Sequence, residues 1–138
     1  MKKIGIILLL CICLCGCKNE KRLVCVLTET SEYSEDETTF DLKYEKDELV
    51  YATLTLKRDY QENIDEMNNW LTMESSNITN SSSLGITGGA TLQDTVAIAT
   101  YNYDVKNHPN LKRMVAEDTK YKALKEVLTD EKYVCTEK

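Results

Sequence analysis

Two alternating segments separated by a charged turn restrict the possible folds of this chain more than any other feature. Phe40, Leu42 and Tyr44 alternate with polar residues, and a second alternation runs through Val50, Ala52, Leu54 and Leu56 after the turn Glu45–Glu48. A period of two residues is typical of a strand with one buried face. A connection of about four residues is too short for a parallel crossover. The pattern therefore predicts an antiparallel hairpin whose apolar side packs against another layer.

The flanking segments predict more strands. Residues 23–27 and 132–136 are strand-like, and residues 86–103 predict a second hairpin in which Gly88 and Gly89 form either a bulge or the turn. The acidic, polar segment 31–38 predicts a loop.

Two other segments change to a helical period. Apolar residues recur at steps of three and four from Ile64 to Ile78, and we expect this helix to fade between Ser75 and Asn80. Residues 119–129 predict a shorter helix near the end of the chain. The fold class expected is α+β: an antiparallel sheet built from hairpins and packed against one long and one C-terminal helix.

The N-terminus has the pattern of a bacterial lipoprotein signal. Lys2 and Lys3 precede an apolar run that ends in Leu14-Cys15-Gly16-Cys17. The run is about half of the ~20 residues that a membrane-spanning helix needs. We expect residues 1–16 to be cleaved, Cys17 to carry a diacylglyceryl group, and residues 17–22 to tether a single domain, 23–138. The predicted location is the extracytoplasmic face of the cell membrane.

Cleavage makes the chain more acidic. The 17 basic residues become 15 against 23 acidic ones, so the net charge changes from −6 to −8. This balance argues against nucleic acid as a partner. It also predicts that the lipid, and no basic patch, holds the protein on an anionic membrane surface.

Cysteine usage points to one disulfide. Of six Cys, three leave with the signal and Cys17 takes the lipid, which leaves Cys25 and Cys135. Outside the cytoplasm this pair can oxidise to a disulfide that closes a loop of about 110 residues. In the chain-entropy model, a bridge of this length stabilises the folded state by ~4 to 5 kcal/mol. Two buried free thiols or a metal pair are the alternatives, although a metal needs more than two ligands.

Chemistry-bearing motifs are scarce in the sequence. The single His108 stands beside Pro109 in a predicted loop, and the acidic run from Glu32 to Glu37 does not have the spacing of a calcium loop. We expect no enzymatic activity, catalytic residues, metal or cofactor. Tyr51, Tyr101 and Tyr103 are candidates for a binding face on the sheet; the alternative is that a helix covers them as part of the core.

The order of these segments resembles the YehR-like small lipoproteins of bacteria. The likeness rests on the lipobox cysteine, the polar tether, the hairpin Tyr44-Glu45-Lys46-Asp47-Glu48-Leu49-Val50 and the final Tyr133-Val134-Cys135. It implies a fold and an anchored location, with no catalytic residue to carry over. The expected function is a membrane-anchored, non-enzymatic binding or accessory module with an unknown protein or small-ligand partner. The alternative is a protective lipoprotein, such as an immunity or superinfection-exclusion factor.

Overall fold

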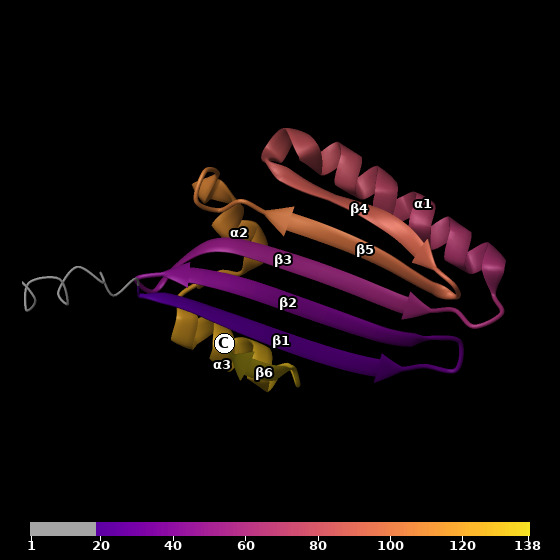
Figure 1. Cartoon of the computed structure of the whole chain (residues 1–138), viewed down its shortest axis with the longest axis horizontal. Coiled ribbons are helices and arrows are strands. Elements are labelled where there is room, and N and C mark those ends of the chain that lie inside the picture. Colours follow the sequence, from indigo (N-terminus) through magenta and orange to yellow (C-terminus); the bar gives the residue numbers. More distant parts are fainter. Residues whose placement is uncertain (1–18) are drawn as a thin grey trace, which may run out of the picture.

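The structure, a computed structural model, describes residues 19–138. The predicted signal and the predicted lipidation site, Cys17, lie outside the described residues. The α+β prediction is confirmed: a six-stranded antiparallel sheet is combined with helices, and most of the sheet consists of hairpins (Figure 1). In chain order the elements are β1 (Glu20–Thr30), β2 (Glu35–Glu45), β3 (Glu48–Asp59), α1 (Ile64–Ser81), η2 (Ser82–Leu84), β4 (Ile86–Gln93), β5 (Val96–Tyr103), η3 (Pro109–Leu111), α2 (Lys112–Val115), α3 (Tyr121–Asp130) and β6 (Val134–Glu137).

The sheet has the strand order β4-β5-β3-β2-β1-β6. Three consecutive strands, β1 to β3, form two hairpins, and β4 and β5 form a third that joins the sheet through β5 beside β3. The last strand, β6, returns to the opposite edge and pairs with β1. Both ends of the described chain therefore lie next to each other at one edge of the sheet.

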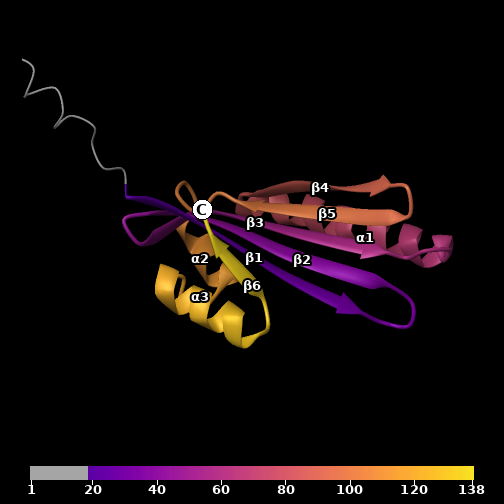
Figure 2. The ribbon, with the colours of Figure 1, turned by 60° about the horizontal axis from the view of Figure 1, so that its bottom comes forward.

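The two ends of the sheet carry different turns. We call the end at Asn19 the proximal end; it also holds the β2–β3 turn, where the Lys46 N–H donates to the Asn19 carbonyl over 3.0 Å. The distal end holds the β1–β2 turn, the β3–α1 junction and the β4–β5 turn, since Glu35 pairs with Asp59 and Asp59 with Val96 (Figures 1 and 2).

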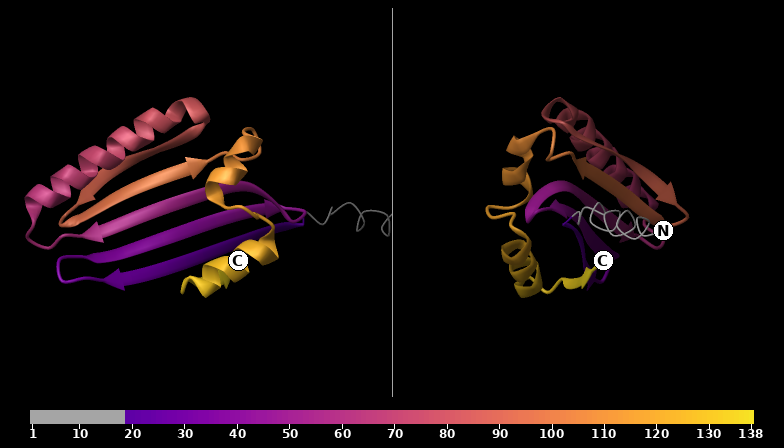
Figure 3. Two further views of the ribbon diagram at one scale, coloured as in Figure 1. Left: turned by 180° about the vertical axis from the view of Figure 1, so that it is seen from behind. Right: turned by 60° about the vertical axis from the view of Figure 1, so that its left-hand side comes forward.

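Both principal helices cover the same face of the sheet, as the view from behind shows (Figure 3, left). The register places Leu42, Ala52 and Tyr103 in one row across three strands, on the side where helices α1 and α3 pack. The opposite face is not covered by a helix of the described chain. This arrangement divides the sheet into a covered face and an open face.

Two hydrophobic clusters fill the covered face. The larger one, here the disulfide cluster, lies between α3 and the sheet and contains Leu23, Cys25, Leu42, Tyr44, Leu49, Ala52, Ile86, Val105, Leu111, Leu124 and Leu128. The smaller one, here the α1 cluster, contains Tyr60, Met67, Trp70, Ala97 and Ala99. Tyr101 packs against both clusters, so they are continuous across the sheet.

Helix α1 extends through the polar segment in which it was expected to fade. The Asn63 side chain caps its start by accepting from the Glu66 N–H. Near its end, Thr79 and Ser81 donate side-chain hydrogen bonds of 2.9 and 2.8 Å to the carbonyls of Ser75 and Asn77. Hydroxyls that donate to a carbonyl four residues earlier are satisfied inside the helix, so these polar residues are compatible with a helix that continues to Ser81.

Other local predictions were also wrong. Residues 35–38 belong to strand β2 instead of a loop. Gly88 and Gly89 form neither a bulge nor a turn, because β4 pairs with β5 in unbroken register from Ile86 to Gln93. A register shift occurs instead between Lys43 and Tyr44 of β2.

That shift changes which residue enters the core. Tyr44 pairs with Leu49, and Leu49 is buried where Val50 was expected.

Candidate functional site

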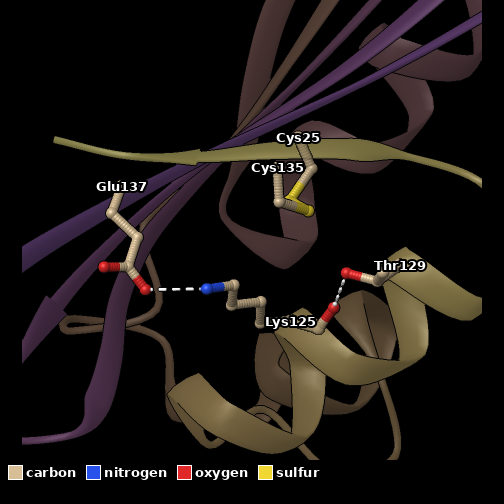
Figure 4. Close-up of a disulfide and its surroundings, with 5 residues drawn as sticks. All are labelled: Cys25, Lys125, Thr129, Cys135 and Glu137. Carbon is tan, nitrogen blue, oxygen red and sulfur yellow. Dashed lines mark hydrogen bonds and ion pairs between the residues drawn. A yellow bond between two sulfur atoms is a disulfide. The ribbon is translucent and has the colours of Figure 1, made fainter.

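Cys25 and Cys135, the two cysteines predicted to pair, are joined in the structure (Figure 4). They stand directly opposite each other in the antiparallel pairing of β1 with β6. Their sulfur atoms are 2.01 Å apart and their Cα atoms 4.0 Å apart. The bond spans 110 residues of sequence and fixes the short edge strand β6 to the first strand.

Helix α3 holds β6 from the covered side. The Lys125 Nζ lies 2.8 Å from the Glu137 Oε1, and this hydrogen bond is the main cause of the lowered pKa of Glu137 (Figure 4). Burial, followed by the bond to Glu137, raises the pKa of Tyr121 to about 12. The Thr129 hydroxyl donates to the Lys125 carbonyl over 2.7 Å within the helix. The contacts of Lys125 and Tyr121 with Glu137 thus hold α3 against β6, the strand that carries Cys135.

The three tyrosines proposed as a binding face do not lie together. Ala52 pairs with Tyr103, and successive side chains of a strand alternate between faces, so Tyr51 points away from the side that Tyr101 and Tyr103 occupy. Tyr101 and Tyr103 pack against the core on the covered face. The structure therefore splits the proposed face, and only Tyr51 remains on the open side.

Tyr101 has a defined structural partner. Its hydroxyl donates to a carboxylate oxygen of Glu74, a residue of α1 that is only 7 % exposed. Burial and this hydrogen bond together raise the pKa of Tyr101 above its ordinary value. A buried carboxylate is costly without such a donor, so the pair serves the packing of α1 on β5.

The open face is dominated by hydroxyl and amide side chains. Thr53 donates to Asn102 over 3.2 Å across β3 and β5. The Lys43 ammonium lies 5.6 Å from the centre of the Tyr51 ring, a cation–π contact. By register the remaining small polar residues of this face include Thr39, Thr55, Thr87, Thr91 and Thr100. The face is half-exposed and carries few apolar side chains at its centre.

A pocket of about 460 Å³ lies at the proximal end, and we call it the proximal pocket. It is lined by residues of β1, of β2, of the first part of β3 and of the chain end: Glu20, Lys21, Arg22, Lys43, Tyr44, Glu45, Val50 and Lys138. Four of these side chains are cationic and two are acidic. By register, Lys21 lies on the same side of the two strands as Tyr44, whereas Arg22 and Lys43 lie on the opposite side.

One ion pair organises this pocket. Arg22 donates two hydrogen bonds to Asp41, of 2.8 and 2.5 Å, which is the bidentate geometry that suits a guanidinium and a carboxylate. The Arg22 hydrogen bond is the main reason that the pKa of Asp41 is lowered, and the charges of Lys43 and Lys138 act in the same direction. Three cations thus surround one carboxylate beside the pocket.

The described residues contain no group of three or more His, Cys, Asp or Glu side chains arranged for a metal ion. His108 precedes the short helix η3, and its ring lies against Gly85, where an added Cβ would come within 2.6 Å of the imidazole. Within residues 19–138, no helix combines the length and apolar character required to span a membrane.

Comparison of the chain with protein-family models, curated proteins and solved structures gives no match. The resemblance to YehR-like lipoproteins accordingly stays a prediction.

Sequence reasoning missed the proximal pocket. Its cationic residues come from β1, β2 and the last residue of the chain, which become neighbours only through strand pairing. The one sequence signal was the pairing of the first and last strands implied by Cys25 and Cys135, which brings Arg22 beside Lys138.

Proposed function

We propose that this chain is a lipoprotein of the extracytoplasmic membrane surface, attached through Cys17, whose folded domain is a binding or accessory module. The observation that carries the proposal is the sequence Leu14-Cys15-Gly16-Cys17 at the end of a short apolar run. A thiol is the side chain that accepts the diacylglyceryl group, and two acyl chains anchor a protein stably where one is marginal.

The position of the domain relative to this motif supports the proposal. Strand β1 begins at Glu20, three residues after Cys17. The link spans at most about 10 Å when fully extended. An anchor at Cys17 therefore keeps the proximal end of the sheet close to the bilayer surface.

The joined cysteines are a second support. A disulfide persists in oxidising compartments and is rare in the bacterial cytosol. Cys25 is fully buried at 0 % exposure and bonded to Cys135. A domain held at the outer face of a membrane is in the compartment where such a bond lasts.

The test is substitution of the predicted lipid attachment site. In a bacterial host supplied with labelled palmitate, Cys17→Ala should abolish labelling and lower the membrane-bound fraction of mature protein at least about tenfold. Cys15→Ala is the matched control, because it also removes a thiol and leaves a small residue before Gly16. Equal labelling of the Cys17→Ala variant and the unaltered chain contradicts the proposal.

A further inference from the structure

The two ends of the sheet differ in charge. Segments 28–37, 57–66 and 93–96, which meet at the distal end, together contain ten acidic and two basic residues. The rest of residues 17–138 contains 13 of each sign. Strand β2 alone has 11 residues, which at about 3.3 Å per residue is about 35 Å, whereas the Debye length at physiological ionic strength is about 8 Å. The distal charge therefore does not keep the proximal end away from a membrane surface.

The loop that follows β5 lies beside the β2–β3 turn. The Lys106 N–H donates to the Val50 carbonyl over 2.9 Å, and the Lys106 Nζ lies 2.9 Å from the Glu45 Oε1. Glu45 in turn pairs with Glu20, the first residue of β1. The loop that leads from β5 into η3 and α2 is thus held toward the proximal end, the end of the sheet nearest to Cys17 (Figure 1).

Two exposed apolar side chains come together at this loop. Leu84 of η2 and Met114 of α2 are 54 % and 53 % exposed. They line one pocket of about 370 Å³ together with residues of the loop 107–111, and we call it the η2–α2 pocket. The His108 ring, which also lines it, lies against Gly85 and so joins this loop to the end of η2.

The lining of the η2–α2 pocket suits a partly apolar partner. Among residues 19–138, the side chains that line it are apolar, amide, hydroxyl or imidazole groups, with no carboxylate, ammonium or guanidinium. The cost of removing a charge from water therefore does not oppose transfer of this surface into a less polar medium. A single exposed apolar side chain is ordinary on a protein surface. Two that share one pocket, at the end of the sheet beside the predicted anchor, indicate a contact surface.

We propose that Leu84 and Met114 insert into the interface of the bilayer to which the chain is attached. This inference rests on the proposed anchor at Cys17, because only residues 18 and 19 separate Cys17 from β1, a link of at most about 10 Å. Segments that lie in a membrane interface bury their apolar side chains about 5–10 Å into the boundary between headgroups and acyl chains. The domain then rests on the membrane through η2 and α2, with its acidic distal end directed away.

The experiment places a fluorophore at each of the two side chains in mature lipoprotein reconstituted in phosphatidylcholine vesicles. With Cys17 lipidated and the disulfide formed, the variants Leu84→Cys and Met114→Cys each carry a single free thiol, which takes a nitrobenzoxadiazole label. Lipids with a nitroxide on the acyl chain quench such a label only at short range. We expect labels at both positions to be quenched at least about threefold more than in the control Leu92→Cys. Leu92 is a matched control because it is also an exposed leucine, near the distal end of β4.

Two outcomes overturn the proposal. One is equal quenching of the labels at positions 84, 92 and 114. The other is a blue shift of the emission at positions 84 and 114 without quenching by the nitroxide lipids, because the pair is then covered by protein, such as a second copy of the chain. Strong quenching at positions 84 and 114 with weak quenching at position 92 supports insertion into the bilayer.

A second preparation separates this proposal from the anchor on which it rests. If mass analysis shows Cys17 without lipid, the proposed function fails. A chain in which a histidine tag replaces residues 1–17 is then bound to the vesicles through a nickel-chelating lipid, which restores a tether at the same point, and the three labelled variants are measured again. Stronger quenching at positions 84 and 114 than at position 92 still supports the inserted surface, and equal quenching at all three overturns it.

Discussion

The disulfide cluster and the α1 cluster stabilise the same sheet face by different means. The disulfide cluster draws its buried residues from Leu23 to Leu128, almost the full length of the domain, and every member is at most 4 % exposed. The α1 cluster draws on residues 60–99 only, and its large members Tyr60, Met67 and Trp70 are 6 to 7 % exposed. In the disulfide cluster, a covalent bond joins two strands, β1 and β6, that are far apart in the sequence. The α1 cluster is covered by a single helix.

This difference predicts which of the two clusters opens more easily. Helix α1 contributes one buried charged residue, Glu74, along with its apolar side chains, and it leaves two large apolar side chains, Ile64 and Met73, exposed. Local opening follows the parts of a fold with the fewest buried apolar contacts. We expect α1 and β4 to open before β1, β2 and β6.

The largest predicted effect is on the disulfide half. Replacing both Cys25 and Cys135 with Ala should lower the free energy of unfolding by about 4 kcal/mol, because the unfolded chain regains a loop of 110 residues. Denaturation in guanidinium chloride measures this, with reduction of the unaltered protein as the matched control. Reduced and oxidised protein that unfold at the same denaturant concentration exclude a stabilising disulfide.

A smaller and more local effect is predicted for the α1 half. Trp70→Ala should lower the free energy of unfolding by about 3 kcal/mol, because the buried indole packs between α1 and the sheet. The Arg58 Cζ also lies 5.4 Å from the centre of this ring, in a cation–π contact. Hydrogen exchange should show faster exchange in α1 and β4, with β1 and β2 much less affected. Trp70→Phe retains a ring and should lose less. Uniform acceleration across the sheet would show that the two clusters open as one unit.

Two tyrosines, one whose hydroxyl has a hydrogen-bond partner and one whose hydroxyl has none, should change the free energy of unfolding in opposite directions when the hydroxyl is removed. Tyr101→Phe should destabilise by about 1 to 2 kcal/mol, because the buried Glu74 loses its donor. Tyr44→Phe should stabilise by up to about 1 kcal/mol, because the Tyr44 hydroxyl is buried with no hydrogen-bond partner. Thermal unfolding of both variants measures the contrast, and effects of the same sign contradict it.

The smallest effect is a pH dependence at the proximal end. Hydrogen bonds from Lys112 and Lys120 lower the pKa of Glu48 from 4.5 to about 2. Because the folded-state pKa is depressed, the contribution of Glu48 is complete above pH 4.5 and is lost as the pH falls toward 2. Glu48→Gln should flatten the acid limb of the melting temperature slightly, whereas Glu126→Gln, an exposed glutamate of α3, should not. Identical acid limbs would show that these ion pairs are too screened to matter.

Much of the fold follows from the sequence, and the misses have physical causes. The β2–β3 hairpin and α1 were predicted because their alternation and helical period are local. The strand start at residues 35–38 was missed because acidic residues favour loops, yet Asp36 and Glu37 pair with Arg58 and Lys57 across β3 over 3.2 and 3.0 Å. Cross-strand ion pairs of this kind are visible only once the register is known.

The three tyrosines of the candidate binding face are separated for a similar reason, because their sides depend on how the strands pair. Alternation within a strand predicts that Tyr101 and Tyr103 share a side, but the side on which Tyr51 lies depends on how β3 pairs with β5. The proximal pocket is likewise a product of pairing, since Arg22 and Lys138 belong to opposite ends of the chain.

The most direct test of this account is the intact mass of the protein extracted from membranes and alkylated without reduction. The account predicts a chain that begins at Cys17, carries diacylglycerol on that residue and takes up no alkyl group at Cys25 or Cys135. A membrane-extracted chain with an alkylated, lipid-free Cys17 would contradict it.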